Sequence, residues 1–153
     1  MPKSDPQVAA YGDVDELNCA LGAALACLPA QAHELTERLG RIQQELFVAG
    51  AILAGQKAAM PDGAAARLER EIDTMTAELP ELRRFILPGG APAGAALHLA
   101  RAVCRRAERA VVGLPDAPAD VVVYLNRLSD HLFVSARWVN RRAGVAETTW
   151  AGL

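Results

Sequence analysis

Apolar residues recur at steps of three and four along most of the chain, which is the period of an amphipathic α-helix. No segment shows the strict alternation of a convincing β-strand. The pattern predicts five helices, with expected bounds of about 8–28, 32–54, 64–80, 91–114 and 119–143. Proline ends the first and third runs because it cannot continue an α-helix, and glycine closes the second.

Short connections rich in proline and glycine separate these runs, as antiparallel neighbours in a helix bundle require. Alanine is frequent, and small side chains let helices approach closely. We therefore predict an all-α fold, a single domain over residues 1–153 in which five helices form an antiparallel bundle. The connection at 85–92 differs from the others, because it is apolar yet built from turn residues. It either folds back onto the core or faces a ligand or another subunit.

Composition narrows the classes of protein. The 153 residues, 52% of them apolar, suffice for a core without metal or disulfide staples, and no apolar run is long enough to span a bilayer. The net charge of −2 argues against a general nucleic-acid binder. The first residues lack a secretory signal, which indicates the cytoplasm. Three cysteines without zinc-site spacing are expected to be buried thiols: Cys19, Cys27 and Cys104.

Arginines gather on the fourth predicted helix. Arg101, Arg105 and Arg109 recur every four residues with Arg106 beside them, and we call these four residues the arginine ridge. Each step of four advances only about 40° around the helix axis, so their side chains lie close together. Two explanations stay open: neutralisation by acids of a neighbouring helix, or binding of an anionic ligand such as phosphate. The acids available on the first helix are Asp13, Asp15 and Glu16.

The fifth predicted helix carries a second polar line, formed by Asn126, Asp130 and Phe133. The Asn126 amide can form hydrogen bonds to a ligand through both its donor and its acceptor atoms. The Asp130 carboxylate can form an ion pair with arginine or bind a metal ion. A polar network between helices explains the same residues equally well. The three histidines have no metal-site spacing and are interpreted as ordinary residues, so no metal ligand can be named. No phosphate-loop or nucleophile-elbow motif is present.

Four blocks occur together and in order. They are Ala10–Asn18 (AYGDVDELN), Phe85–Gly90 (FILPGG), Arg101–Arg109 (RAVCRRAER) and Tyr124–Asp130 (YLNRLSD). Together they closely resemble the PduO-type ATP:cob(I)alamin adenosyltransferases over almost the whole chain. The resemblance implies a homotrimer of five-helix bundles with an active site at each subunit interface. It also implies transfer of the 5′-deoxyadenosyl group of ATP to the cobalt of cobalamin, with release of triphosphate.

The resemblance further implies roles for single residues. Asp15 and Arg105 match a salt bridge across the subunit interface, and with Arg101, an essential arginine of the ridge, they form the expected catalytic set. Phe85 and Phe133 match aromatic residues at the corrin face, where an apolar wall excludes a lower axial ligand. The positions that match ATP-contacting segments are Lys3, Arg105, Arg106, Ala107, Glu108, Arg109 and Asn126.

The resemblance also implies Mg²⁺ with the ATP, and a flavoprotein reductase and an adenosylcobalamin-dependent enzyme as partners. The family carries a glycine-rich Thr-Arg-x-Gly-Asp-type segment ahead of the equivalent of Lys3, and this sequence starts after it. We expect that segment to belong to the protein. Its loss would favour a non-catalytic trimeric bundle that binds or delivers cobalamin. A purely structural bundle would instead pair the whole ridge with acids.

Overall fold

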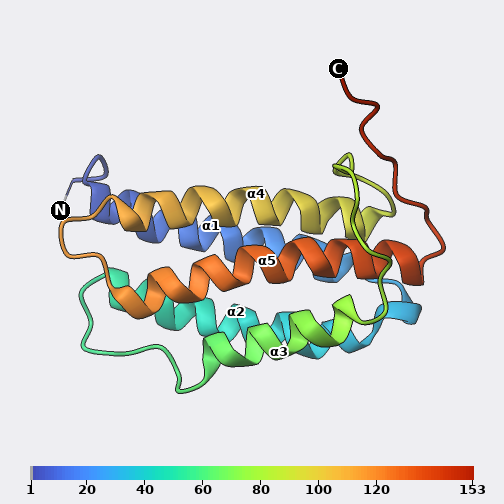
Figure 1. Cartoon of the computed structure of the whole chain (residues 1–153). Helices are drawn as coiled ribbons and strands as arrows, with labels where there is room; N and C mark the ends of the chain where they lie inside the picture. The colour runs from blue at the N-terminus through green and yellow to red at the C-terminus, as the bar shows by residue number, and fades with distance from the viewer. Residues whose placement is uncertain (1) are drawn as a thin grey trace.

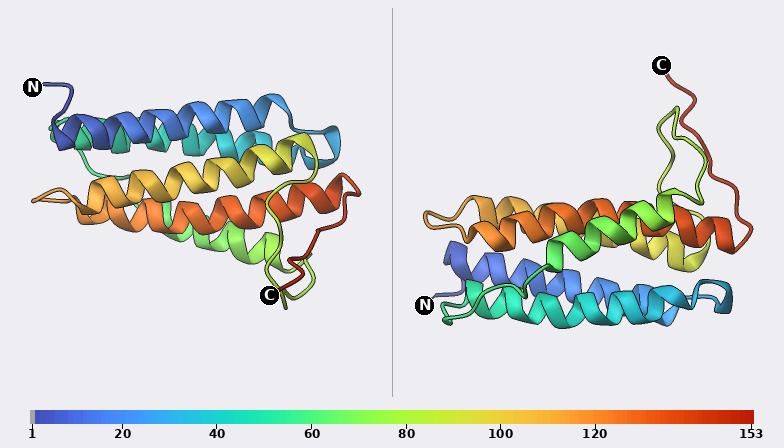
Figure 2. Two further views of the ribbon diagram at one scale, coloured as in Figure 1. Left: turned by 90° about the horizontal axis from the view of Figure 1, so that it is seen from above. Right: turned by 60° about the horizontal axis from the view of Figure 1, so that its bottom comes forward.

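The computed structural model describes residues 2–153 and confirms the five-helix bundle (Figure 1). Consecutive helices run in opposite directions, which the short connections predicted (Figure 2). Between residues 2 and 153 the single β feature is one antiparallel bridge that joins Ile86 to Thr149. The helices are α1 Pro6–Ala26, α2 Glu34–Leu53, α3 Ala64–Thr76, α4 Pro92–Val112 and α5 Ala119–Arg142, with a short 3-10 turn at Ala30–Ala32.

The helix ends differ from the predicted bounds by a few residues, for local reasons. Helix α1 begins two residues early because the Asp5 carboxylate accepts a 2.8 Å hydrogen bond from the Gln7 amide and Pro6 occupies the first turn. Helix α3 ends at Thr76 rather than at Pro80. Its last residues form tighter turns, in which the Leu79 amide donates to the Thr76 carbonyl.

Helix α4 lies at the centre of the packing, against both α1 and α5, while α3 packs on α5 and α2 on α1. The core contains leucines from every helix, and small residues such as Ala100 and Ala107 are fully buried where α4 meets its neighbours. Close approach buries apolar surface, which is the main favourable contribution to folding. The packing fixes both flanks of α4, the helix that carries the arginine ridge.

A polar network joins α2, α3 and α5 inside the bundle. The Arg41 guanidinium donates two hydrogen bonds, of 2.8 and 2.6 Å, to the Glu71 carboxylate. The fully buried His131 ring lies 3.0 Å from the same carboxylate through Nε2 and 3.1 Å from the Ser135 hydroxyl through Nδ1. Burial lowers the pKa of His131. Burial would raise the pKa of Glu71, but the hydrogen bonds from His131 and Arg41 and the charge of Arg41 outweigh it and lower that pKa to about 2. Every charge in this network therefore has its partner within the chain.

The expectation for the cysteines was right for one residue of three. Cys104 is buried and its thiol donates to the Leu125 carbonyl at 3.3 Å, whereas Cys19 and Cys27 are exposed. Both lie on the outer side of α1 or just past its end, where the three- and four-residue apolar period does not point to the core. Among the described residues, none of the helices has the length and apolarity needed to cross a membrane.

Candidate active site

The arginine ridge divides into two parts in the structure. Arg106 turns toward α1, where its guanidinium forms ion pairs with Asp13, at 3.7 Å, and with Glu16. Pairing with acids of a neighbouring helix, one of the two explanations for the ridge, is therefore confirmed for this residue. The prediction that Arg106 contacts ATP stays a prediction, since its charge is already balanced within the chain.

The other three arginines of the ridge have no such partner. In residues 2–153 no carboxylate forms an ion pair with Arg101, Arg105 or Arg109. Arg105 and Arg109 are exposed, and the Arg101 guanidinium lies 5.5 Å from the centre of the Phe133 ring on α5, within the range of a cation–π contact. The face of α4 next to α5 thus carries positive charge that the chain does not neutralise.

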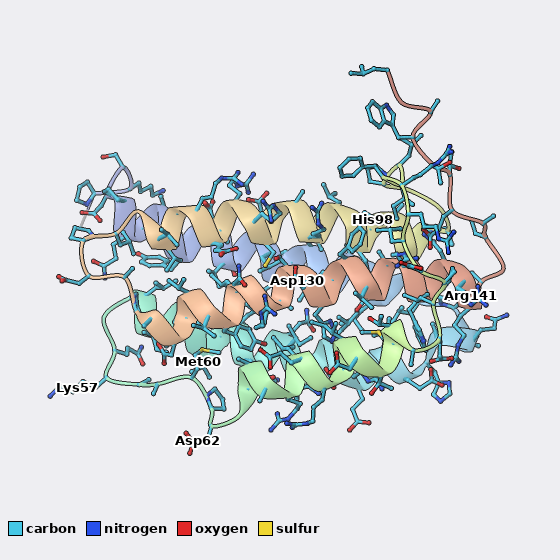
Figure 3. All side chains as sticks on the ribbon, viewed as in Figure 1. Lys57, Met60, Asp62, His98, Asp130 and Arg141 are labelled. Carbon is cyan, nitrogen blue, oxygen red and sulfur yellow. The ribbon has the colours of Figure 1, made fainter. Side chains whose placement is uncertain are left out.

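Polar side chains border this face along α5. The Asn126 amide donates to the Glu108 carboxylate at 3.1 Å and accepts from Arg127 at 2.8 Å. Asp130 lies one turn further along α5 (Figure 3). Its carboxylate pairs with Arg127 at 2.9 Å. Ala107 is fully buried in the core, so its side chain faces away from this surface. Both open readings of Asn126 fit this geometry, because a network between helices also presents donors and acceptors to a ligand.

His98 is a residue of this region that the sequence did not distinguish. Its ring lies 5.9 Å from the Phe133 ring in an edge-to-face arrangement, and only 6% of the residue is exposed. Burial, followed by the charge of Arg101, lowers its pKa, so the ring is neutral near pH 7. A lone histidine in a helical pattern gives no signal for this contact, which depends on the packing of α4 against α5.

The apolar connection at 85–92 leaves Phe85 77% exposed, so this side chain does not fold back onto the core. Its ring packs edge-to-face against Trp150, at 6.2 Å between centres. The Phe85 carbonyl accepts from the Trp150 amide, and the Leu87 amide donates to the Thr148 carbonyl, both at 2.8 Å. We call the paired segments 85–87 and 148–150 the ribbon. Trp150 could not be predicted as part of this region, because it lies outside any periodic segment.

Asn140 of α5 fixes the turn that follows the ribbon. Its amide donates to the Gly89 carbonyl and accepts from the Ala91 amide, both at 2.9 Å. Gly90 has a φ of 115°, and a Cβ there or at Gly94 would collide with the Asn140 side chain. Both positions therefore require glycine, and the turn that carries Phe85 is held on the bundle.

Asp15 and Lys3 are not brought to the ridge within one chain. Asp15 lies on the side of α1 that faces α2, where it borders a shallow hollow with Gln44 and the exposed ring of Phe47. Lys3 is exposed in the turn before α1. The predicted pair of Asp15 with Arg105 is therefore absent from the single chain.

Comparison with known proteins identifies the family of this chain. The sequence profile of cobalamin adenosyltransferase matches residues 1–139. The chain is 43% identical to the corrinoid adenosyltransferase of Bacillus subtilis, over 97% of this chain and 81% of that protein. It is 40% identical to corrinoid adenosyltransferase MMAB of Mus musculus, over 95% of this chain and 67% of that protein.

Solved structures agree with the sequence comparison. A variant PduO-type ATP:corrinoid adenosyltransferase from Lactobacillus reuteri, complexed with cobalamin and ATP, superposes with a TM-score of 0.94. The two sequences are 36% identical, and the match covers 99% of this chain and 90% of the other. Because the profile, the relatives and the fold agree over nearly the whole chain, the protein belongs to the cobalamin adenosyltransferase family.

Proposed function

We propose that this protein is a corrinoid adenosyltransferase, which transfers the 5′-deoxyadenosyl group of ATP to the cobalt of cob(I)alamin. In this reaction the cobalt–C5′ bond forms, the C5′–O bond breaks and triphosphate leaves with the electron pair of that bond. The observation that carries the proposal is the face of α4 that presents Arg101, Arg105 and Arg109 without a carboxylate partner in the chain. Membership of the family supports it independently.

The protein's part in this reaction is to position the substrates and to stabilise the leaving group. Cob(I)alamin is itself a strong nucleophile, so the site needs no general base or covalent residue. Arg105 and Arg109 are placed to bind the triphosphate through charge-assisted hydrogen bonds, whose strength grows as negative charge develops. The hydrogen-bonded pair of Glu108 and Asn126 offers acceptors and donors to the nucleoside. We assign Lys3 to the same nucleotide, at the start of α1.

The aromatic residues form the corrin part of the proposed site. Phe85 is largely exposed on the ribbon, and Phe133 lies under the Arg101 guanidinium where α4 meets α5. An apolar side chain at the lower face of the corrin excludes the axial ligand, which makes reduction of Co(II) easier. Trp150 supports this role by donating to the Phe85 carbonyl, and Asn140 does so by holding the turn that follows at Gly89.

We infer that the complete site forms between subunits of a homotrimer. Asp15 faces α2, whereas Arg105 faces the α5 side of α4, so a salt bridge between them requires a second subunit. Phe47, which is 69% exposed beside Asp15, supports burial of this face in an assembly. In that arrangement Asp15 would orient Arg105 while the guanidinium keeps donors for phosphate.

We propose that Mg²⁺ enters the site together with ATP rather than as an ion held by this chain alone. The described residues include no cluster of three or more histidine, cysteine, aspartate or glutamate side chains that could hold a metal. A Mg²⁺ ion that accompanies ATP would therefore take its oxygen ligands mainly from phosphate and water.

We place the reaction in the cytoplasm, with a flavoprotein reductase supplying reduced cobalamin and an adenosylcobalamin-dependent enzyme taking the product.

An assay of the full-length protein with cob(I)alamin and ATP tests the proposal. We expect adenosylcobalamin to form with release of one triphosphate per turnover. The corrinoid absorption spectrum measures the first product, and phosphorus NMR measures the second. Omission of ATP is the control. Tight corrinoid binding without any cobalt–carbon bond formation would contradict the proposal and favour a delivery protein.

A further inference from the structure

His98 is a buried histidine of α4 whose ring has no hydrogen-bond partner among the described residues (Figure 3). The other buried histidine, His131, contacts Glu71 and Ser135 through its two ring nitrogens. The His98 ring instead packs against the Phe133 ring of α5, and it borders a cavity of about 200 Å³ behind the turn at 87–90. Hydrogen bonding within the chain therefore does not explain a histidine at this position.

Phe133 connects His98 to the arginine ridge. The centre of its ring lies 5.9 Å from that of His98, with the two planes at 68°, and 5.5 Å from the Arg101 guanidinium. His98 and Arg101 are three residues apart on α4, so both side chains reach the same half-buried ring from one helix. An edge-to-face pair contributes more than its apolar area alone. His98 therefore helps to fix the Phe133 ring under Arg101.

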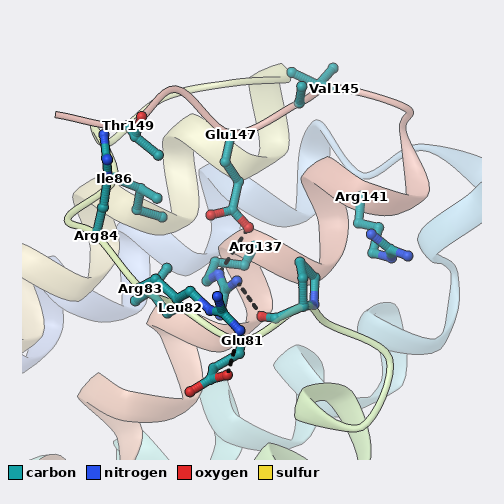
Figure 4. Close-up of a pocket in the computed structure, with 12 residues that line it drawn as sticks. Glu81, Leu82, Arg83, Arg84, Ile86, Arg137, Arg141, Val145, Glu147 and Thr149 are labelled. Carbon is teal, nitrogen blue, oxygen red and sulfur yellow. Dashed lines mark hydrogen bonds and ion pairs between the residues drawn. The ribbon is translucent and has the colours of Figure 1, made fainter. Parts of the chain in front are cut away.

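The charged groups around His98 come from α4, from α5 and from the segment after α5. Burial and the charge of Arg101 lower the pKa of His98, whereas the charge of Glu147 raises it. Glu147 lines the same small cavity as His98, and its carboxylate accepts a 2.9 Å hydrogen bond from Arg137 of α5 (Figure 4). The other segments around the ring contain no acidic or basic side chain: the connection at 85–92 and residues 17–26 of the antiparallel α1. The ring is therefore neutral above pH 6.5.

We propose that His98 is a positioning residue for adenosyl transfer, whose neutral ring holds Phe133 under the Arg101 guanidinium and releases it when protonated. The inference rests on the proposed function, in which Phe133 contacts the corrin. A proton on His98 would place a second cation within one helical turn of Arg101 and would attract the ring toward Glu147. The small cavity beside the ring provides the space for this movement. Phe133 would then lose its edge-to-face partner, and the corrin would be bound less tightly at acid pH.

The first test compares three side chains at position 98 in turnover with cob(I)alamin and ATP. His98→Phe keeps an aromatic ring that cannot take up a proton, and His98→Ala removes the ring. At about pH 8 we expect His98→Ala to raise KM for cobalamin about fivefold and His98→Phe to stay within about twofold of the wild type. KM for ATP should be the same in all three proteins, since the ring contacts Phe133 and not the nucleotide part of the proposed site.

The pH profile separates positioning from a structural role. We take the ratio of kcat/KM for cobalamin in the wild-type protein to that in His98→Phe, because other titrating groups are common to both proteins and cancel. This ratio should be constant above pH 6.5 and fall at least about threefold by about pH 5, as His98 takes up its proton. The matched control is His33→Phe, the same replacement at an exposed histidine, for which the ratio should not change with pH.

Two results would overturn the role of His98. One is a wild-type to His98→Phe ratio that stays constant down to about pH 5. The other is a lower Tm in His98→Ala with unchanged KM for cobalamin, which would show that the ring only stabilises the fold. Absence of adenosyl transfer by the wild-type protein would instead contradict the proposed function. The same ratio, measured for the Kd of cobalamin, would then still test His98.

Discussion

Arginine side chains in this bundle have two opposite kinds of surroundings. We call Arg41, Glu71 and His131 the paired group, and Arg105 and Arg109 the unpaired group. Arg41, between α2 and α3, donates two hydrogen bonds to Glu71 and one of 3.0 Å to Glu45. Arg105 and Arg109 on α4 meet no carboxylate of their own chain. The first group holds three helices together, whereas the second can bind an anion from outside. The difference lies in the location of the counter-charge rather than in the arginines themselves.

The largest expected effect belongs to the unpaired group. Arg105→Ala should lower the rate of adenosyl transfer by at least about 100-fold, because a donor to the departing triphosphate is lost. The helical fold of the chain should be retained, since the Arg105 side chain is exposed and has no ion pair within residues 2–153 of its own chain. Turnover is measured with cob(I)alamin and ATP, and Arg70→Ala is the control. Normal turnover in Arg105→Ala would contradict the assignment of this site.

The paired group should give the reverse result. Glu71→Ala leaves Arg41 and His131 without their shared partner, which should lower the free energy of unfolding by about 3 kcal/mol. Denaturant titration measures this loss. Turnover of the fraction that remains folded should change little, because Glu71 lies on the α3 side of α5, away from the ridge. Lost turnover with unchanged stability would show that the two groups are not separate.

Loss of the Phe85 ring should affect turnover differently for the two oxidation states of the cobalamin substrate. In Phe85→Ala, turnover that starts from Co(II) should fall about tenfold more than turnover from pre-reduced Co(I), because the apolar ring acts on the reduction. Trp150→Ala should give a smaller change of the same kind, since it supports Phe85 from the ribbon. Equal losses from both oxidation states would refute the proposed role of Phe85.

Acid should reduce the contribution of Glu71 and His131 to stability, whereas the arginines of the ridge keep their charge. The pKa of Glu71 is lowered from 4.5 to about 2 in the fold, so its contribution to stability is present above pH 4.5 and is lost as pH falls toward 2. Burial lowers the pKa of His131 below 6.5, which adds a loss of stability that starts near that pH. Tm should therefore fall steadily below pH 6.5, and His131→Gln should flatten the upper part of the curve. An identical curve in that variant would contradict the assignment.

Substitution of Arg106 should have the smallest effect of these variants, because Arg106 is the one residue of the ridge that is paired within residues 2–153 of the chain. Its pairs with Asp13 and Glu16 are largely exposed, so Arg106→Ala should cost less than about 1 kcal/mol of stability. We expect KM for ATP to rise less in Arg106→Ala than in Arg109→Ala, where the rise should be about tenfold. The reverse order would place the nucleotide on the α1 side of α4.

The fold could be predicted from the sequence because every helix has an apolar period and is followed within a few residues by proline or glycine. The four sequence blocks likewise indicated the family. The division of the ridge could not be predicted, because Arg105 and Arg106 are neighbours in sequence and differ by about 100° around the axis. That angle turns Arg106 toward Asp13 and leaves Arg105 free, but the position of α1 is known only from the structure.

The ribbon and the buried network were also beyond the sequence. Trp150 belongs to a segment without periodicity, and its contact with Phe85 spans more than sixty positions of the chain. Arg41, Glu71 and His131 resemble ordinary surface residues of amphipathic helices until the three helices pack together. Long-range contacts between polar residues carry no local signal, whereas apolar periodicity does.

A crystal structure of the full-length protein with ATP tests the central claim most directly, since it shows which arginines the nucleotide uses. We expect the triphosphate to lie within hydrogen-bond distance of Arg105 and Arg109, at the junction with a second subunit, while Arg41 keeps its two bonds to Glu71. A nucleotide bound away from the ridge, or a ridge fully paired with carboxylates of neighbouring subunits, would contradict the account.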